Sequence, residues 1–229
     1  MEENAPLILL HGALGSKAQF QSLQPLLEPH FQLHMLDLPG HGKGAEINAP
    51  LRIETMAAAL KNYIRENELV KPHIFGYSMG GYIALWLESR EPETFADITT
   101  LATKFDWTEE TSAKEAAMLN AGKIREKVPQ YAEWLQKMHG ENWEPLLEKT
   151  AEMMLHLGKK KLIDEALLQK VQIPVRVAVG DRDKMVSLEE TVWAYRNLPK
   201  GELQVLPNTP HPLEKVEQKI LVAMLTDPE

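Results

Sequence analysis

Six short runs rich in apolar residues stand out along the chain, each bounded by polar or turn-forming residues. They cover residues 7–10, 31–36, 72–75, 98–102, 175–179 and 203–206. Runs of this length that end in Gly, Asp or Pro are typical of strands, and an unbroken run such as 7–10 is expected of a strand buried on both faces of a parallel sheet.

The segments between these runs carry apolar residues at helical spacing. They predict helices over residues 17–27, 53–66, 80–87, 188–197 and 213–225. Strands that alternate with helices in this way are typical of βαβ units, so we expect an α/β fold around a mostly parallel, six-stranded sheet flanked by helices.

This alternation stops between residues 104 and 170, where no strand pattern is visible. Four helical segments are predicted there instead, over residues 109–127, 130–139, 144–157 and 161–170. We therefore expect a core made of residues 1–103 and 171–229, with residues 104–170 as an all-helical insertion.

Composition narrows the possible partners. The 229 residues are 44% hydrophobic and 25% charged, with a net charge of −8 and no basic cluster beyond residues 159–161. These values are ordinary for a globular domain and argue against nucleic acid or an anionic membrane as a partner. The absence of cysteine excludes disulfides and thiolate metal sites. The N-terminal apolar run, 7–10, is too short for a signal peptide or a membrane span, so we expect a cytoplasmic protein without stable membrane association.

The strand at 72–75 runs almost directly into the helix at 80–87 through Gly76-Tyr77-Ser78-Met79-Gly80. A strand that turns straight into a helix holds the corner residue in a strained conformation and needs small neighbours, since a Cβ at position 76 or 80 would meet the opposing backbone. The hydroxyl of Ser78 is then presented beside the positive end of a helix, a suitable position for a nucleophile.

Ser78, Asp183 and His211 each come just after a predicted strand. Because the carboxyl ends of parallel strands open on the same edge of a sheet, these residues can converge. Nucleophilic catalysis uses a hydroxyl, an imidazole that takes its proton and a carboxylate that holds the imidazole's tautomer, and the order Ser, Asp, His fits this arrangement. Asp181 competes with Asp183 for the carboxylate role, because both follow the same strand.

Taken together, these pieces resemble the α/β-hydrolase superfamily. The matching stretches are residues 11–12, 37–42, 76–81 and 180–183, together with His211. The resemblance implies that Ser78 is the nucleophile, His211 the base and Asp183 the acid, and that the backbone N–H groups of Ala13 and Met79 form the oxyanion hole. It also identifies the helical insertion as the family's variable cap or lid.

Two features depart from the family pattern. The family commonly begins with a β-hairpin, whereas only about six residues precede the first predicted strand here, so we expect a sheet that lacks the N-terminal strands. The residue before the late histidine is often Gly in the family and is Pro210 in this chain.

Other candidate ligands were weighed against structural roles. His11, His41 and Asp37 match no metal-binding spacing, so we expect neither a metal nor a cofactor. The remaining histidines are expected to be surface or core residues. Of the large apolar residues in the insertion, we expect a subset to line a pocket above Ser78. They are Trp107, Met118, Trp134, Met138, Trp143, Met153 and Met154.

These observations lead to the hypothesis of a serine hydrolase that cleaves small-molecule carboxylic esters with an apolar portion through an acyl-enzyme. One alternative is a C–C bond hydrolase or a lyase of the menaquinone-pathway SHCHC-synthase type, which shares Gly-Tyr-Ser-Met-Gly-Gly but usually has Arg where this chain has Tyr82. Another is a slow ligand-sensing module of the same fold. The sequence indicates neither the acyl or alcohol preference nor the oligomeric state.

Overall fold

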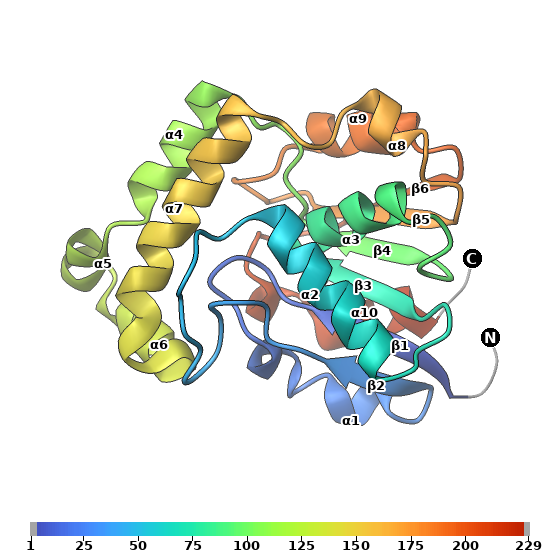
Figure 1. Ribbon diagram of the computed structural model, residues 1–229, viewed down its shortest axis with the longest axis horizontal. Helices are drawn as coiled ribbons and strands as arrows, with labels where there is room; N and C mark the ends of the chain where they lie inside the picture. Colours follow the sequence, from blue (N-terminus) through green and yellow to red (C-terminus); the bar gives the residue numbers. More distant parts are fainter. Residues whose placement is uncertain (1–3, 227–229) are drawn as a thin grey trace.

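A single sheet of six parallel strands lies at the centre of the molecule (Figure 1). The structure is a computed structural model, and it describes residues 4–226. The strands are β1 (Ala5–Leu10), β2 (Phe31–Met35), β3 (His73–Tyr77), β4 (Ile98–Leu101), β5 (Val175–Gly180) and β6 (Gly201–Leu206). Their order across the sheet is β2-β1-β3-β4-β5-β6. The predicted six-stranded parallel sheet is therefore confirmed, and within residues 4–226 no strand precedes β1.

Alternate residues of the strands pack on opposite faces of the sheet, as the two-residue period of a strand requires. Ile8 and Leu10 belong to a core on one face, which is covered by α2 (Ile53–Glu66), α3 (Met79–Arg90) and α9 (Leu188–Asn197). Leu7 and Leu9 belong to a second core on the other face. That face is covered by the 3₁₀ helix η1 (Lys17–Phe20), α1 (Gln24–Leu27) and α10 (Gln218–Thr226).

The strand register brings the loops that matter for function to one edge of the sheet. Leu10 of β1 is paired with Gly76 of β3, and Gly180 of β5 is paired with Leu206 of β6. The residues that follow these strands therefore leave the sheet at similar positions along the strand direction, and all of them lie at the carboxyl edge of the sheet.

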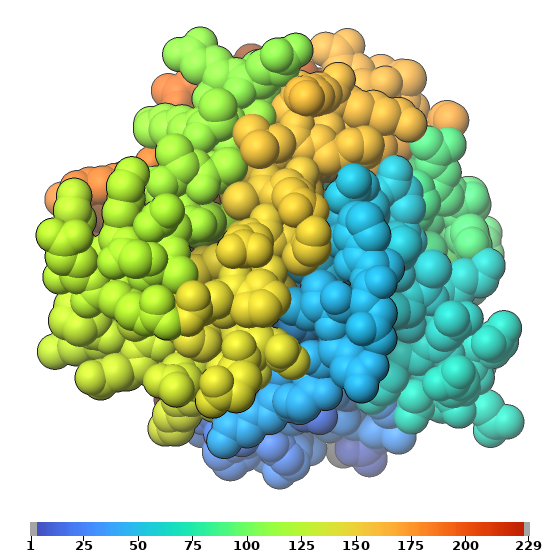
Figure 2. Space-filling model, turned by 60° about the vertical axis from the view of Figure 1, so that its left-hand side comes forward, coloured from blue at the N-terminus to red at the C-terminus, as the bar shows by residue number. Residues whose placement is uncertain are grey.

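Between β4 and β5 the structure has only helices. They are α4 (Glu109–Met118), α5 (Ala121–Lys127), α6 (Pro129–His139), the 3₁₀ helix η2 (Gly140–Asn142), α7 (Trp143–Lys159) and α8 (Glu165–Leu168). Helices α4 to α7 form a group beside the sheet, on the left in Figure 1. Figure 2 shows α7 lying along the chain segment that leads into α2, where the Asn142 side chain donates to Ala45 O at 2.5 Å. We call residues 104–170 the helical segment.

Two predicted helix extents are wrong in ways that the local chemistry explains. The helix expected over residues 17–27 is split into η1 and α1, because Pro25 fits the first turn of a helix but would clash with the preceding turn in a helix interior. The helix expected over residues 109–127 is interrupted before Asn120, whose side chain accepts a hydrogen bond from Lys123 N and starts α5 instead.

Two further predicted helices are shorter than expected. Of residues 161–170 only α8 is helical, since the Ile163 N–H is bound to the hydroxyl of Tyr82 and Asp164 caps the helix that follows. At the C-terminal end, the helix expected over residues 213–225 is divided into the 3₁₀ helix η3 (Leu213–Lys215) and α10, with Val216 in an extended conformation between them.

No helix within residues 4–226 combines the length and the apolar character needed to cross a membrane.

Candidate active site

Ser78 occupies a sharp corner between β3 and α3. Its φ of 52° and ψ of −114° lie outside the regions that residues with a side chain normally adopt. A Cβ at Gly76 would lie 2.4 Å from Gly81 N, and one at Gly80 would lie 2.4 Å from Leu10 O. The corner therefore depends on glycine at both positions, as the sequence predicts.

Neighbouring elements hold the corner in place. The Ser78 N–H donates to Leu101 O at 2.8 Å, and the Thr103 hydroxyl donates to Ser78 O at 3.0 Å. Both partners come from the end of β4 or the residues just after it. The strained backbone is thus fixed by tertiary contacts, which is the condition under which such strain persists.

His211 and Asp183 form a close pair at the same edge of the sheet. The Nδ1 atom of His211 lies 2.7 Å from Asp183 Oδ2, and the Asp183 side chain is only 1% exposed. Asp181 does not take this position, because its Oδ1 accepts a hydrogen bond from Thr209 N at 3.2 Å. Of the two aspartates that the sequence leaves open, the structure brings Asp183 to the imidazole.

The loop that carries His211 is anchored to β3 and to β5. The Tyr77 hydroxyl donates to His211 O at 2.9 Å, and burial raises the pKa of Tyr77, so this group stays a donor. On the other side, a Cβ at Gly180 would lie 2.0 Å from Thr209 O, so glycine is needed for this close approach. The two contacts fix the height of the imidazole above the sheet.

Ala13 lies in the loop after β1, next to the serine corner. A Cβ at Gly12 would lie 3.1 Å from Ser78 Cβ, so this loop passes close to Ser78. His11 supports it from below: its Nδ1 donates to Gly12 O at 2.8 Å, and its Nε2 accepts the Leu38 N–H at 3.0 Å. This bonding requires a neutral ring, and burial lowers the pKa of His11 from 6.5 to about 4.

Two further buried histidines join this loop to the helical segment. His139, at the end of α6, accepts the Gly42 N–H on Nδ1 at 3.0 Å and donates from Nε2 to Leu14 O at 2.8 Å. The ring of His41 lies between those of His11 and His139, with ring centroids 4.9 and 6.1 Å away. Burial lowers the pKa of both His41 and His139, so all three rings are neutral at pH 7. We call His11, His41 and His139 the histidine cluster.

The cluster is not arranged as a metal site. Both ring nitrogens of His11 and of His139 are engaged by backbone groups. His41 Nδ1 lies 3.0 Å from Pro39 O, and His41 Nε2 has no hydrogen-bond partner within the described residues. Asp37 Oδ1 accepts a hydrogen bond from Lys17 N at 2.7 Å. Within residues 4–226, no group of three or more His, Asp or Glu side chains is placed to hold a metal ion.

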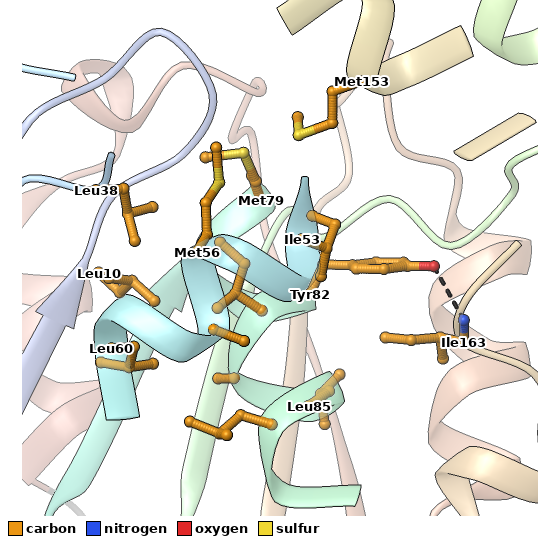
Figure 3. Packing of buried hydrophobic residues seen from close by; sticks show 14 of the residues in the cluster. Leu10, Leu38, Ile53, Met56, Leu60, Met79, Tyr82, Leu85, Met153 and Ile163 are labelled. Atoms are coloured by element: carbon orange, nitrogen blue, oxygen red, sulfur yellow. Dashed lines mark hydrogen bonds between the residues drawn. The ribbon is translucent and has the colours of Figure 1, made fainter. Parts of the chain in front are cut away.

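A cavity is lined by four of the five residues that the sequence assigns to catalysis, and Asp183 lies outside it. Ala13, Ser78, Met79 and His211 all line it, and its other walls come from α2, α3, the helical segment and the turn after β5. Figure 3 shows Met153 of α7 facing Met79, and Tyr82 bonded to Ile163 N. The complete lining is Ala13, Ile53, Ser78, Met79, Tyr82, Lys104, Trp107, Glu115, Met153, Met154, Leu157, Met185, Val186 and His211.

Of the large apolar residues expected to supply pocket walls, Trp107, Met153 and Met154 do so. Met118 is instead half exposed on the outside of α4. The free volume at the centre of the cavity is about 40 Å³, well below the roughly 300–1,000 Å³ of typical ligand pockets. The walls therefore close tightly over Ser78 in this structure.

Sequence reasoning missed two charged residues of the cavity, Lys104 and Glu115. Lys104 comes shortly after the end of β4 and therefore lies at the carboxyl edge of the sheet. This position in the sequence is a usable sign that Lys104 belongs to the site. Glu115 carries no such signal. It lies within a helix whose polar residues do not follow a clear stripe, so its burial comes from the packing of α4 on α7.

The sequence matches a family model. Residues 5–156 fit the model described as the alpha/beta hydrolase fold. This range includes β1, the serine corner and most of the helical segment.

Curated relatives share this similarity over much of the chain. The pimeloyl-[acyl-carrier protein] methyl ester esterase of Neisseria meningitidis serogroup C is 25% identical over 224 residues, which cover 89% of this chain and 85% of the relative. The protein of the same name from Xanthomonas campestris pv. campestris strain B100 is 36% identical over 90 residues, or 39% of this chain and 34% of that protein.

Solved structures show the same architecture. A thermophilic esterase from Thermogutta terrifontis superposes with a TM-score of 0.77 and 20% sequence identity, over 97% of this chain and 88% of that one. At this level of identity the similarity speaks for the fold alone.

Proposed function

The chain belongs to the α/β-hydrolase family, and on that basis we propose that it is a serine hydrolase that cleaves carboxylic esters. One observation carries the proposal. The strained Ser78 corner and His211 line the same cavity although they lie far apart in the sequence, and His211 is hydrogen-bonded to the buried Asp183 behind it. A hydroxyl, an imidazole and a buried carboxylate in this relation are the parts required for acyl transfer.

In the proposed reaction, Ser78 Oγ attacks the ester carbonyl while His211 Nε2 takes the hydroxyl proton. Asp183 accepts the Nδ1–H of His211, which keeps Nε2 free to act as a base and stabilises the imidazolium that forms. His211 then protonates the leaving alcohol. Water, activated by the same imidazole, releases the acid from the acyl-enzyme.

The backbone N–H groups of Ala13 and Met79 are proposed to hold the oxyanion. Met79 is the first residue of α3, where backbone N–H groups have no partner within the helix and the helix dipole favours negative charge. Ala13 comes from the loop that passes close to Ser78. Removal of one such donor typically costs about 2.7–4 kcal/mol of transition-state stabilisation.

The walls of the cavity indicate the substrate class. Apart from Ser78, His211, Lys104 and Glu115 they are mainly apolar, with four methionine side chains that adapt to different shapes. We propose a small-molecule ester with an apolar portion. The curated relatives are named for the methyl ester of an acyl group on a carrier protein, which shares the ester and the acyl portion but not the small size. A cytoplasmic location stays a prediction.

We further propose that residues 104–170 act as a cap on a core of residues 1–103 and 171–229. The support is that Trp107, Met153 and Leu157 from this segment face the catalytic residues across the cavity. Because the free volume is only about 40 Å³, the cap or its side chains must shift when an ester binds.

The proposal is tested by labelling with a fluorophosphonate probe and by hydrolysis of p-nitrophenyl esters. The label is expected on Ser78. Ser78→Ala should lower kcat by about a millionfold and abolish labelling, because the nucleophile is lost. The exposed Ser22 provides a matched control, and Ser22→Ala should retain labelling and turnover. Near-full esterase activity in Ser78→Ala would contradict the proposal.

The alternative reactions use the same catalytic residues and differ in the substrate. Position 82, where the lyase type usually has Arg, is a buried tyrosine whose hydroxyl accepts the Ile163 N–H. This favours the esterase. A panel that compares p-nitrophenyl esters with vinylogous diketones separates ester from C–C cleavage, and saturable binding with slow turnover of every substrate would favour a ligand-sensing module.

A further inference from the structure

Glu115 is a carboxylate enclosed by the cavity that holds the catalytic residues. It comes from α4, is only 5% exposed and shares the cavity lining with Ser78 and His211. Charged side chains are almost never this deeply buried unless they have partners. A reason for its position must therefore be found in the surrounding packing or in a ligand.

The packing of α4 on α7 directs Glu115 inward. A Cβ on Gly158 of α7 would lie 2.0 Å from Ser112 Oγ, so the two helices touch closely at this point. Ser112 and Glu115 are three residues apart and therefore lie on the same face of α4. The close contact at Gly158 turns this whole face, including Glu115, toward α7 and the cavity.

The carboxylate is not fully paired within the protein. Its Oε2 atom is buried and accepts no hydrogen bond from any residue in the described part of the chain. Ser112, one turn earlier, is already engaged, because its hydroxyl donates to Glu109 O at 3.1 Å. Buried polar atoms in folded proteins nearly always have a partner, so we expect the missing donor to come from a ligand in the cavity that Glu115 lines.

The other charge in the cavity already has partners of its own. Lys104 Nζ donates to Met185 O at 3.2 Å, lies 3.9 Å from Glu190 Oε1 and sits 5.8 Å from the centre of the Trp107 ring. The remaining walls around Glu115 are largely apolar. An acceptor in such surroundings discriminates strongly between ligands with and without a donor, because a mismatched ligand leaves it unpaired.

We propose that Glu115 determines specificity by accepting a hydrogen bond from a hydroxyl, amide or ammonium group on the apolar portion of the substrate. This inference rests on the proposed ester hydrolysis and narrows its substrate class. The preferred ester is not a plain hydrocarbon ester. It carries a hydrogen-bond donor at a fixed distance from the ester carbonyl.

Matched esters test the inference. Methyl 6-hydroxyhexanoate and methyl heptanoate differ only in a terminal O–H or CH₃ group. Methyl 8-hydroxyoctanoate and methyl nonanoate form a second pair, in which the terminal group lies farther from the ester carbonyl. 6-Hydroxyhexyl acetate and heptyl acetate place the same difference on the alcohol side. Methyl 6-aminohexanoate adds an ammonium group. The readout is the ratio of kcat/KM within each pair, in which general changes in activity cancel.

In the unaltered protein, kcat/KM should be about tenfold higher for the hydroxyl member of at least one pair. This ratio corresponds to the free energy of about one hydrogen bond to a charged group. Glu115→Leu should remove this preference. Glu115→Gln should retain part of it for the hydroxyl ester and lose it for the ammonium ester, since the amide oxygen still accepts but has no charge. Glu110, exposed on the same helix, gives the control Glu110→Gln, which should leave every ratio unchanged.

Binding of the same pairs to the Ser78→Ala protein, measured by calorimetry, separates this inference from the proposed function. A hydroxyl preference in binding that is lost in Ser78→Ala/Glu115→Leu would support the inference even if no ester were hydrolysed. Equal ratios in the unaltered protein and in Glu115→Leu, in both kinetics and binding, would overturn it while leaving ester hydrolysis intact.

Discussion

At the scale of single residues, Asp183 performs two tasks with one carboxylate. Its Oδ2 holds His211, while its Oδ1 accepts the backbone N–H groups of Met185 and Val186 at 2.8 and 2.9 Å. Both of these residues line the cavity. The residue proposed to orient the imidazole therefore also holds two residues of the cavity wall in place.

Asp183→Asn is expected to lower kcat by about 10⁴-fold, because an amide no longer selects the productive tautomer of His211. Steady-state hydrolysis of a p-nitrophenyl ester measures this change. Asp181→Asn is the matched control, since the described contacts of the Asp181 side chain are a hydrogen bond from Thr209 N and an ion pair with Arg182, and neither involves His211. The kcat of this variant should stay within about tenfold of the unaltered protein. An equal loss in both variants would reject Asp183 as the orienting residue.

Residue-scale prediction from the sequence depends on where a residue lies relative to a strand. Ser78, Asp183 and His211 all follow strands, and parallel-sheet topology alone places them at one edge. Glu115 and His139 lie within or at the end of helices of the helical segment. Their burial depends on how α4 and α6 pack, and a single sequence carries little information about that packing.

At the scale of elements, the turn from β3 into α3 tolerates almost no added volume. Gly80→Ala would bring a Cβ to 2.4 Å from Leu10 O and 2.9 Å from His11 O. We expect a loss of about 1–3 kcal/mol in the free energy of unfolding, since backbone must move to relieve the clash. Denaturant unfolding followed by circular dichroism measures it.

Gly122→Ala is the control for Gly80→Ala. Gly122 lies inside α5, where a Cβ would meet only Asn120 Oδ1 at 3.4 Å. Alanine is favoured over glycine in helix interiors by about 1 kcal/mol, so this variant should be neutral or slightly more stable. A Gly80→Ala protein as stable as Gly122→Ala would show that the corner is less tightly packed than the structure indicates.

Element boundaries were harder to predict than element types. The six strands are found where apolar runs predict them, because burial in the middle of a sheet requires such runs. The helix expected over residues 161–170 fails for a reason outside its own sequence: the Tyr82 hydroxyl holds Ile163 N in an extended segment. Periodicity within the segment does not contain this tertiary contact.

At the scale of the whole molecule, the histidine cluster joins the helical segment to the loop that carries Ala13. The cluster is stable only with neutral rings, because His11 and His139 each accept a backbone N–H on one nitrogen. Core and helical segment are thus coupled through groups that titrate in mildly acidic solution.

We therefore expect acid to destabilise the fold. The pKa of His11 falls from 6.5 in the unfolded chain to about 4 in the folded protein. The contribution of the neutral ring to the free energy of unfolding is therefore fully present above pH 6.5. It is lost as the pH falls from 6.5 to 4, by about 3 kcal/mol. His41 and His139 act in the same direction.

Two measurements check this expectation. Denaturant unfolding at a series of pH values between 7.5 and 4 gives the free energy of unfolding, and proton NMR of the imidazole signals gives the pKa of each histidine. Carboxylates also contribute to acid unfolding, so the NMR titration decides the matter. A His11 ring that titrates near 6.5 in the folded protein would refute the proposed role of the cluster.

The methionine lining of the cavity has a consequence for redox chemistry. Met79, Met153, Met154 and Met185 surround Ser78, and the chain contains no cysteine that would react with oxidants first. Conversion of these thioethers to sulfoxides would place polar S=O groups against the apolar part of a substrate. Mild treatment with hydrogen peroxide should therefore raise KM for apolar esters before it affects the catalytic residues, and methionine sulfoxide reductases should reverse the change.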